Sequence, residues 1–322
     1  PYVERMLEGF AFLTARVQLK IEEEYPKFCQ HLLEIVYPDY LAPLPSMTVV
    51  QMLPDCGDTD LANGVKVERG SSLHSGLGPN MQTPCEYRTA HDVELFPVNV
   101  VDADYLGTRA AMAKLGIKPG RQVSAGMRIS FEAAKGVDVS NLKMKQLPLF
   151  LAGSGTVPTA LYEHILANSC GLSVIIGEKG DRQVFPLKKE NVCSYGFEPD
   201  QALLNYKSKS FEGYRLIREY FAFPERFRFV NFTGLDSALP NGKGQRFDLV
   251  IHLDNRNNDL ENVIGKRNFL PFCVPAINLF PKRADRITLN TIDHEFHVLP
   301  DRSRPLDYEV HQVISVTGHG KQ

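Results

Sequence analysis

The 322-residue sequence contains no tryptophan and no excess of charge of either sign. Lysine and arginine number 36, against 38 aspartate and glutamate residues. A chain this close to neutral, with its charges mixed along its length, lacks the positive field that attracts nucleic acid or anionic lipid. The absence of tryptophan also removes the commonest aromatic platform for sugars. We therefore expect neither nucleic acid nor a membrane surface among the partners of this chain.

The sequence also lacks any run approaching the roughly 20 apolar residues that a membrane-spanning helix needs. The chain begins at Pro1 without the basic and apolar segments of a signal peptide. Its cysteines form no CxxC pair, which favours reduced thiols over a disulfide or zinc framework. These are Cys29, Cys56, Cys85, Cys170, Cys193 and Cys273. We expect a cytoplasmic chain with no direct membrane insertion, no metal and no cofactor.

The first segment has the apolar spacing of a helix. Apolar residues recur at intervals of three and four from Val3 to Ile21, including Phe10. A second apolar set, which contains Phe12 and Leu19, lies on a different side. Two apolar stripes predict burial between two partners or within a bundle, and burial in the chain's own core is the alternative. Pro26 predicts the start of a second helix, because its missing N–H costs nothing in a first turn.

After an extended, proline-rich connector at residues 42–46, the apolar period changes to two. Strands are predicted at residues 48–53, 65–69, 85–89, 92–98, 122–132, 172–176, 246–254 and 308–316. Helices are predicted at residues 156–166, with Thr156 as the N-cap, and at 212–223. The fold class is therefore α+β, strand-dominated and multi-domain, with an N-terminal helical element. We divide the chain into a helical element (1–43), a β-rich domain with one inserted helix (44–200) and a second β-rich α+β domain (201–322).

No motif predicts catalysis. The run from His294 to His297 is one residue too short for a helical zinc-protease motif, and we interpret it as a polar strand end. Gly153-Ser154-Gly155 lacks the spacing of a phosphate loop or a nucleophile elbow, and is interpreted as a turn before a helix. Residues 241–244 are a tight turn ahead of a strand. A carboxylate pair for hydrolysis would be invisible in sequence, and nothing singles out two of the 38 acids.

One segment interleaves aromatic residues with arginines, the residue types that dominate interface hot spots. The candidate contact residues there are Tyr214, Arg215, Arg218, Tyr220, Phe221 and Arg226. The alternative is that the aromatics fill a core while the arginines pair with Glu219 and Glu225. Lys282 and Arg283 are further candidate contacts, or belong to a self-contained, salt-bridged turn.

Several long segments resemble a single family. Residues 1–16, 33–43 and 210–224, then 275–280 with 282–285, and 300–302 with 304–310, are similar to the TssF (VasA/ImpG) family of the bacterial type VI secretion system. Residues 56–80 match this family more weakly. Residues 67–72 and 88–93 are similar to a strand–turn–strand pattern of phage baseplate proteins. Family chains are longer, so we expect this sequence to lack an N-terminal stub and a substantial C-terminal part.

The resemblance implies a non-enzymatic structural role in the baseplate wedge, a fold like that of contractile-tail phage wedge proteins, and no cofactor. It implies assembly with TssG and a second copy of the chain, two copies to one, around the spike hub beneath the contractile sheath. TssK, TssE and the VgrG hub are the further partners implied, in a cytoplasmic baseplate docked at the inner membrane complex. The alternatives are a tail baseplate protein of a phage-like contractile particle and, from another class, a β-rich hydrolase.

Overall fold

The computed structural model describes residues 2–55, 59–78, 82–177, 182–204, 211–290, 292 and 294–320. The chain divides into two compact units. Unit 1 comprises Pro1–Pro45, Tyr206–Arg215 and Pro281–Gln322, and unit 2 comprises Ser46–Asn205 and Leu216–Phe280. The three-domain division drawn from the sequence stays a prediction, although several strand pairs of unit 2 cross the boundary placed at residue 200.

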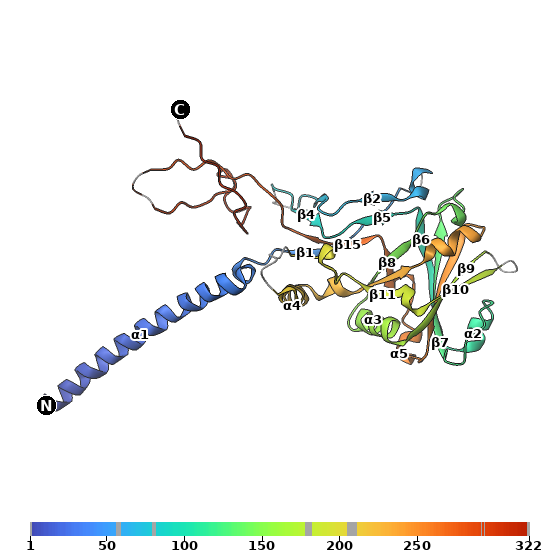
Figure 1. Ribbon diagram of the computed structural model, residues 1–322, viewed down its shortest axis with the longest axis horizontal. Helices are drawn as coiled ribbons and strands as arrows, with labels where there is room; N and C mark the ends of the chain where they lie inside the picture. Colours follow the sequence, from blue (N-terminus) through green and yellow to red (C-terminus); the bar gives the residue numbers. More distant parts are fainter. Residues whose placement is uncertain are drawn as a thin grey trace. The chain divides into compact units, whose positions relative to one another are not determined.

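Unit 1 is dominated by one long helix, α1 (Tyr2–Val36), drawn in blue in Figure 1. Its 35 residues run through Pro26, so the predicted break there is wrong. Proline removes one backbone hydrogen bond, but good helix formers such as glutamate, lysine and leucine flank it on both sides. A 3₁₀ turn, η1 (Pro38–Leu41), follows the helix. No described residue of α1 is buried.

Unit 2 is built around two antiparallel sheets with a hydrophobic core between them (Figure 1). The five-stranded sheet has the order β10 (Gln183–Leu187), β9 (Ser169–Ile176), β13 (Arg246–Leu253), β7 (Ala125–Ala133), β6 (Val98–Leu106). The four-stranded sheet has the order β11 (Val192–Tyr195), β12 (Phe229–Thr233), β8 (Gln146–Leu151), β14 (Phe269–Pro271). Helix α3 (Val157–Asn168) completes the core by burying Leu161 and Ile165. Thr156 is the N-cap residue of α3, but its side chain makes no capping hydrogen bond.

The second face of the five-stranded sheet is also covered. Val250 of β13 and Ile175 of β9 pack there against Met112 of the short helix α2 (Arg109–Ala113). Thr108 caps this helix by accepting a hydrogen bond from the Ala111 N–H at 3.2 Å. The strand predicted at residues 246–254 is confirmed. The prediction that only one of its faces is buried is wrong, because α2 covers Val250 on the other face.

A third, four-stranded sheet has the order β1 (Met47–Gln51), β15 (Cys273–Ile277), β4 (Glu86–Thr89), β3 (Ser72–His74). Strand β2 (Val65–Val67) pairs separately with β5 (Val93–Leu95). Strands β2, β3, β4 and β5 thus form a two-stranded ribbon that bends at residues 68–71, where Gly70 adopts a positive φ of 81°. We call this element the bent ribbon.

The remaining helices are short, apart from α4 (Glu212–Ala222), which confirms the helix predicted at 212–223. Helix α5 covers Asn258–Glu261. Further 3₁₀ turns are η2 (Thr59–Asn63), η3 (Val139–Asn141), η4 (Lys189–Asn191), η5 (Pro199–Gln201), η6 (Pro224–Phe227), η7 (Leu235–Ser237), η8 (Leu239–Asn241) and η9 (Lys266–Asn268). None of the helices in the described ranges has an apolar stretch long enough to span a membrane.

One strand prediction is wrong. Residues 308–316 alternate as a strand would, yet the described residues beyond Phe280 form neither helix nor strand. A strand requires a hydrogen-bonded neighbour, and no strand pairing joins this segment to another described part of the chain. The alternating pattern alone was therefore insufficient.

Candidate interaction surfaces

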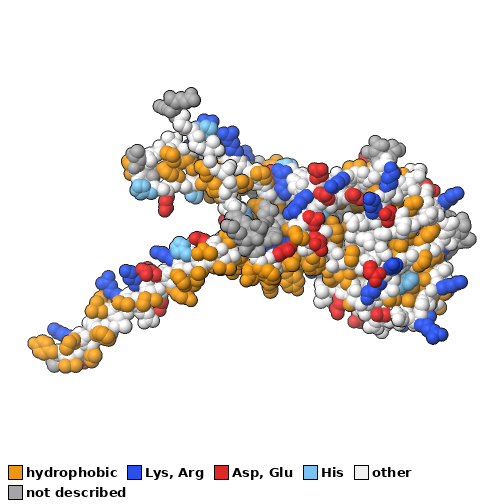
Figure 2. Space-filling model, viewed as in Figure 1, with side chains coloured by type: hydrophobic (Ala, Val, Ile, Leu, Met, Phe, Trp, Pro, Cys, Tyr) orange, Lys and Arg blue, Asp and Glu red, His pale blue; other side chains and the backbone are white. Residues whose placement is uncertain are grey.

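The first candidate surface is helix α1, most of whose apolar side chains are exposed. On one side Phe10, Leu13 and Val17 are 71%, 62% and 60% exposed. On the other side Phe12 and Leu19, seven residues apart, are 63% and 62% exposed. Figure 2 shows hydrophobic side chains along the whole length of this helix. Water disfavours that much apolar surface, which is typical of an interface.

The second candidate surface is the outer face of α4, a helix whose polarity is inverted. Glu219 is fully buried, and Arg215 is 1% exposed. On the opposite side Ile217, Tyr220 and Phe221 are 56%, 57% and 82% exposed. Hydrophobic side chains gather over α4 in Figure 2. A surface helix of a monomer turns its apolar stripe inward, so this arrangement indicates a partner on the outer face.

The exposed aromatic rings of α4 belong to a row of ring contacts within unit 2. Tyr220 lies 5.6 Å from Phe221 and 6.1 Å from Phe227, measured between ring centroids. Phe227 in turn lies 5.0 Å from Phe197, which is 40% exposed. We call Phe197, Ile217, Tyr220 and Phe221 the α4 patch. Phe197 was not anticipated from the sequence, because it lies 17 residues before Tyr214, where the aromatic–arginine segment begins.

A buried ion pair supports the α4 patch from below. The Glu219 carboxylate pairs with the Arg226 guanidinium of η6, and both side chains are fully buried. Glu219 Oε1 also accepts hydrogen bonds from the backbone N–H groups of Leu203 (3.1 Å) and Leu204 (2.9 Å). The Arg226 guanidinium carbon lies 4.7 Å from the centre of the Phe227 ring. The charges of α4 therefore hold the helix in place, while its apolar side chains face outward.

The candidate arginines of this segment divide into two groups. Arg226 pairs with Glu219, Arg215 pairs with Glu212 at 2.9 Å, and Arg228 approaches Glu225 at 3.6 Å. Arg215 and Arg226 are too deeply buried to offer surface to a partner, so the alternative of internal pairing holds for them. Arg218 is partly exposed.

The remaining candidate contacts lie in unit 1. Tyr214 is 44% exposed and its ring lies 5.4 Å from that of Tyr37. Lys282 and Arg283 are exposed, and the Lys282 ammonium lies 4.1 Å from the centre of the Tyr308 ring. The role of all the exposed candidates in binding stays a prediction.

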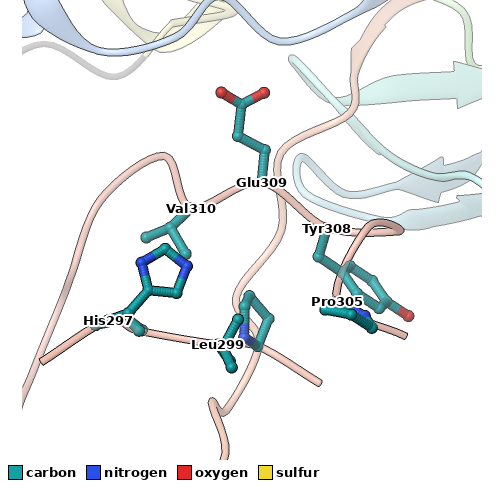
Figure 3. A pocket seen from close by; sticks show the side chains of 8 residues that line it. His297, Leu299, Pro305, Tyr308, Glu309 and Val310 are labelled. Carbon is teal, nitrogen blue, oxygen red and sulfur yellow. The ribbon is translucent and has the colours of Figure 1, made fainter. Parts of the chain in front are cut away.

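The His294–His297 run forms no strand, so its interpretation as a strand end is wrong, and His297 lines a pocket of about 360 Å³. His297 lies beside Val310, near Leu299, while the Glu309 carboxylate points away from the cavity (Figure 3). Within the described residues, no group of three or more histidine, cysteine, aspartate or glutamate side chains is placed to hold a metal ion.

A second pocket, of about 380 Å³, lies beside α3 and is lined by Glu163, His164 and Asp259 among others. His164 belongs to a hydrogen-bonded chain: its Nε2 lies 3.1 Å from the Tyr105 hydroxyl and its Nδ1 3.1 Å from Asn168 Oδ1. Tyr105 also accepts a hydrogen bond from the Asn257 N–H at 2.8 Å. These hydrogen bonds satisfy the polar groups of Tyr105 and His164, which is a structural role.

Three carboxylates have shifted pKa values, and the direction of these shifts does not suggest a general acid. Hydrogen bonds hold the pKa of Asp92, Asp138 and Asp301 below the usual range: from Lys66 to Asp92, from Ser140 to Asp138 and from Ser303 to Asp301. A general acid at neutral pH needs a raised pKa. The distinctive features of this chain are therefore its exposed apolar helices.

A strand-rich α+β chain with exposed apolar helices is typical of a subunit of a larger assembly. Comparison with known proteins identifies the class as a component of a type VI secretion system. The family model described as "Type VI secretion system, TssF" matches residues 1–322. The chain therefore belongs to the TssF family. The type VI secretion system component TssF1 of Pseudomonas aeruginosa is 47% identical over 320 residues, which are 99% of this chain and 51% of that protein.

A solved structure agrees with this assignment. The chain matches a chain of the TssK-TssF-TssG baseplate subcomplex of a type VI secretion system with a TM-score of 0.76 and 28% identity. The match covers 98% of this chain and 57% of the solved one. The chain thus spans little more than half the length of the relatives it matches, and the family resemblance recognised in the sequence is confirmed.

Proposed function

We propose that this chain is a structural, non-enzymatic part of the baseplate wedge of a type VI secretion system. The observation that carries the proposal is α1, a 35-residue helix, about 50 Å long, without a buried residue in its described part. Helices in proteins gain most of their stability from packing an apolar face against other elements, so α1 is expected to pack against helices of its partners. Because the chain belongs to the TssF family, we expect these partner helices to be those of other type VI secretion system subunits.

The partners follow from the relatives. The solved relative belongs to a TssK-TssF-TssG baseplate subcomplex, so TssG and TssK are the first partners proposed for this chain. Two apolar sides on α1 fit a bundle in which two copies of the chain meet one TssG. TssE and the VgrG hub are more distant partners in the same baseplate. The assembly works in the cytoplasm, docked at the inner membrane complex.

The work of such a subunit is to hold partners at defined angles until the sheath contracts, which demands large interfaces rather than a reaction centre. The proposal is tested by co-expressing the protein with a TssG-type subunit and capturing the complex through a tag on the partner. Wild-type protein is expected to be retained. A variant with Phe10→Glu and Val17→Glu on one side of α1 is expected to be lost. The control is Arg16→Gln, a change at a polar position of the same helix. Equal capture of all three would contradict the assignment of α1.

A further inference from the structure

A surface loop of unit 2, residues 196–204, is held by the charged side chains of Arg69, which is distant in sequence, and of Glu219 and Arg226, which follow the loop in the chain. We call it the clamped loop. Its regular structure consists of the 3₁₀ turn η5 (Pro199–Gln201). One internal hydrogen bond, from the Gly196 N–H to Gln201 Oε1 at 2.7 Å, closes its first part. The other bonds described below come from the bent ribbon, from α4 and from η6.

The bent ribbon holds the loop through Arg69. The guanidinium donates to two backbone carbonyls of the loop, Asp200 O at 2.9 Å and Ala202 O at 2.8 Å. Arg69 is itself fixed at the bend, since its N–H donates to Asp92 Oδ1 at 2.8 Å while Asp92 Oδ2 pairs with Lys66 at 2.6 Å. A planar guanidinium suits two acceptors at a fixed separation, which an ammonium cannot reproduce.

Helix α4 holds the same loop from its other end. Glu219 accepts from the N–H groups of Leu203 and Leu204, immediately after the two carbonyls that Arg69 binds. Arg226 pairs with Glu219 and donates to the carbonyls of Gly196 and, at 3.1 Å, Gln201. The loop residues that bind the Arg69 guanidinium are therefore followed at once by the residues that bind the Glu219 carboxylate.

We infer that Arg69 is a positioning residue for the α4 patch, acting through the clamped loop, so that the bent ribbon and the part of α4 that belongs to unit 2 (Leu216–Ala222) move as one body. If Arg69 releases Asp200 O and Ala202 O, the next two residues lose their fixed approach to Glu219, and α4 loses part of its anchorage. The role of the α4 patch in docking rests on the wedge proposed above. In that wedge, a partner bound to α4 that moves would displace the bent ribbon as well.

The test is amide hydrogen exchange on the full-length protein without any partner, comparing wild type with Arg69→Met. The amides of Leu203 and Leu204 and those of α4 from Leu216 to Ala222 are expected to exchange about three- to tenfold faster in the variant, the factor that a lost hydrogen bond of ordinary strength gives. Amides of β7 and β13 are expected to be unchanged. Arg69→Lys should restore protection partly, because lysine can satisfy one of the two carbonyls at a time.

The matched control is Arg246→Met, which removes a partly exposed guanidinium paired with Glu132 at 2.9 Å between neighbouring strands of the five-stranded sheet. It should leave the exchange of Leu203, Leu204 and α4 unchanged. Unchanged exchange at these sites in Arg69→Met would overturn the inference. Faster exchange throughout β7 and β13 would also overturn it, because Arg69 would then be a residue of global stability. Since no partner is present, neither result depends on whether the wedge proposal is correct.

Discussion

Glu219 and Arg226 form a fully buried ion pair beneath an exposed aromatic surface, and this relationship determines how α4 is presented. Burying two charges costs several kcal/mol for each ion, which mutual attraction and additional hydrogen bonds must offset. The two loop N–H groups on Glu219 and the two loop carbonyls on Arg226 provide those bonds. The helix therefore retains its orientation although Ile217 and Phe221 on its outer face are exposed.

Removal of one member of this pair should strongly destabilise unit 2. Glu219→Gln leaves the Arg226 charge buried without its counter-charge, and should lower the free energy of unfolding by about 3–5 kcal/mol. Urea denaturation followed by circular dichroism measures this change. Glu132→Gln, which breaks the exposed pair with Arg246, is the control and should cost no more than about 1 kcal/mol. Similar costs for the two variants would contradict the importance given to the buried pair.

Replacing both members by apolar residues should be much milder. The double variant Glu219→Leu with Arg226→Met keeps similar volumes and removes both charges of the pair, and buried pairs replaced in this way are often neutral in stability. We expect it to recover more than half of the stability lost in Glu219→Gln. A double variant as unstable as the single one would mean that the loop contacts, rather than the paired charges, carry the stabilisation.

Stability should fall as the pH falls from 7 towards 5, partly through His91. This side chain is 4% exposed and lies edge-on to the ring of Tyr195, with centroids 5.0 Å apart. Burial lowers the pKa of His91, and the nearby positive charge of Arg226 lowers it further. The hydrogen bond with the backbone carbonyl of Asp92 raises this pKa but does not outweigh the two other effects. The folded protein therefore binds this proton less readily than the unfolded chain, so stability is complete above the unfolded pKa near 6.5 and is lost below it.

His91→Phe isolates this contribution. Its unfolding free energy should depend less on pH between 7 and 5 than that of the wild type, although burial also lowers the pKa of His164 and His252, which remain. His31→Phe, on the exposed surface of α1, is the control and should retain the wild-type pH dependence. Parallel curves for wild type and His91→Phe would refute the assignment.

Fluorescence can test the α4 patch directly because the chain contains no tryptophan. Phe221→Trp introduces a single reporter at a side chain that is 82% exposed. Binding of a TssG-type partner should bury the indole and shift its emission to shorter wavelength, after subtraction of the signal from the wild-type complex. A tryptophan at Phe211, which is 70% exposed but lies outside the patch, provides the comparison. Emission from Phe221→Trp that is unchanged in a stable complex would remove the patch from the interface.

Much of the secondary structure was predictable because it depends on local patterns. The alternation at residues 246–254 and the period of 3.6 at 212–223 identify β13 and α4 correctly. Strand β15 was missed as a strand because all five of its residues are buried, which removes the alternation that marks a half-buried strand. The strand predicted at 308–316 failed for the opposite reason, since its pattern exists without a neighbouring strand.

The candidate surfaces were less predictable, because exposure depends on tertiary contacts. The sequence identified the aromatic residues of α4 and named Glu219 as a possible partner for an arginine. It could not show that Glu219 and Arg226 face inward while Tyr220 and Phe221 face outward, since ordinary amphipathic reasoning predicts the reverse. Nor could it join Arg69 to residues 200 and 202, because those contacts span more than 130 positions.

The proposal that this chain is a wedge subunit can be tested by measuring the mass of the complex that it forms. Full-length protein co-expressed with a neighbouring TssG-type subunit should be purified and measured by light scattering. We expect one stable species containing two copies of this chain and one copy of the partner. A monomer that elutes separately from the partner would contradict it.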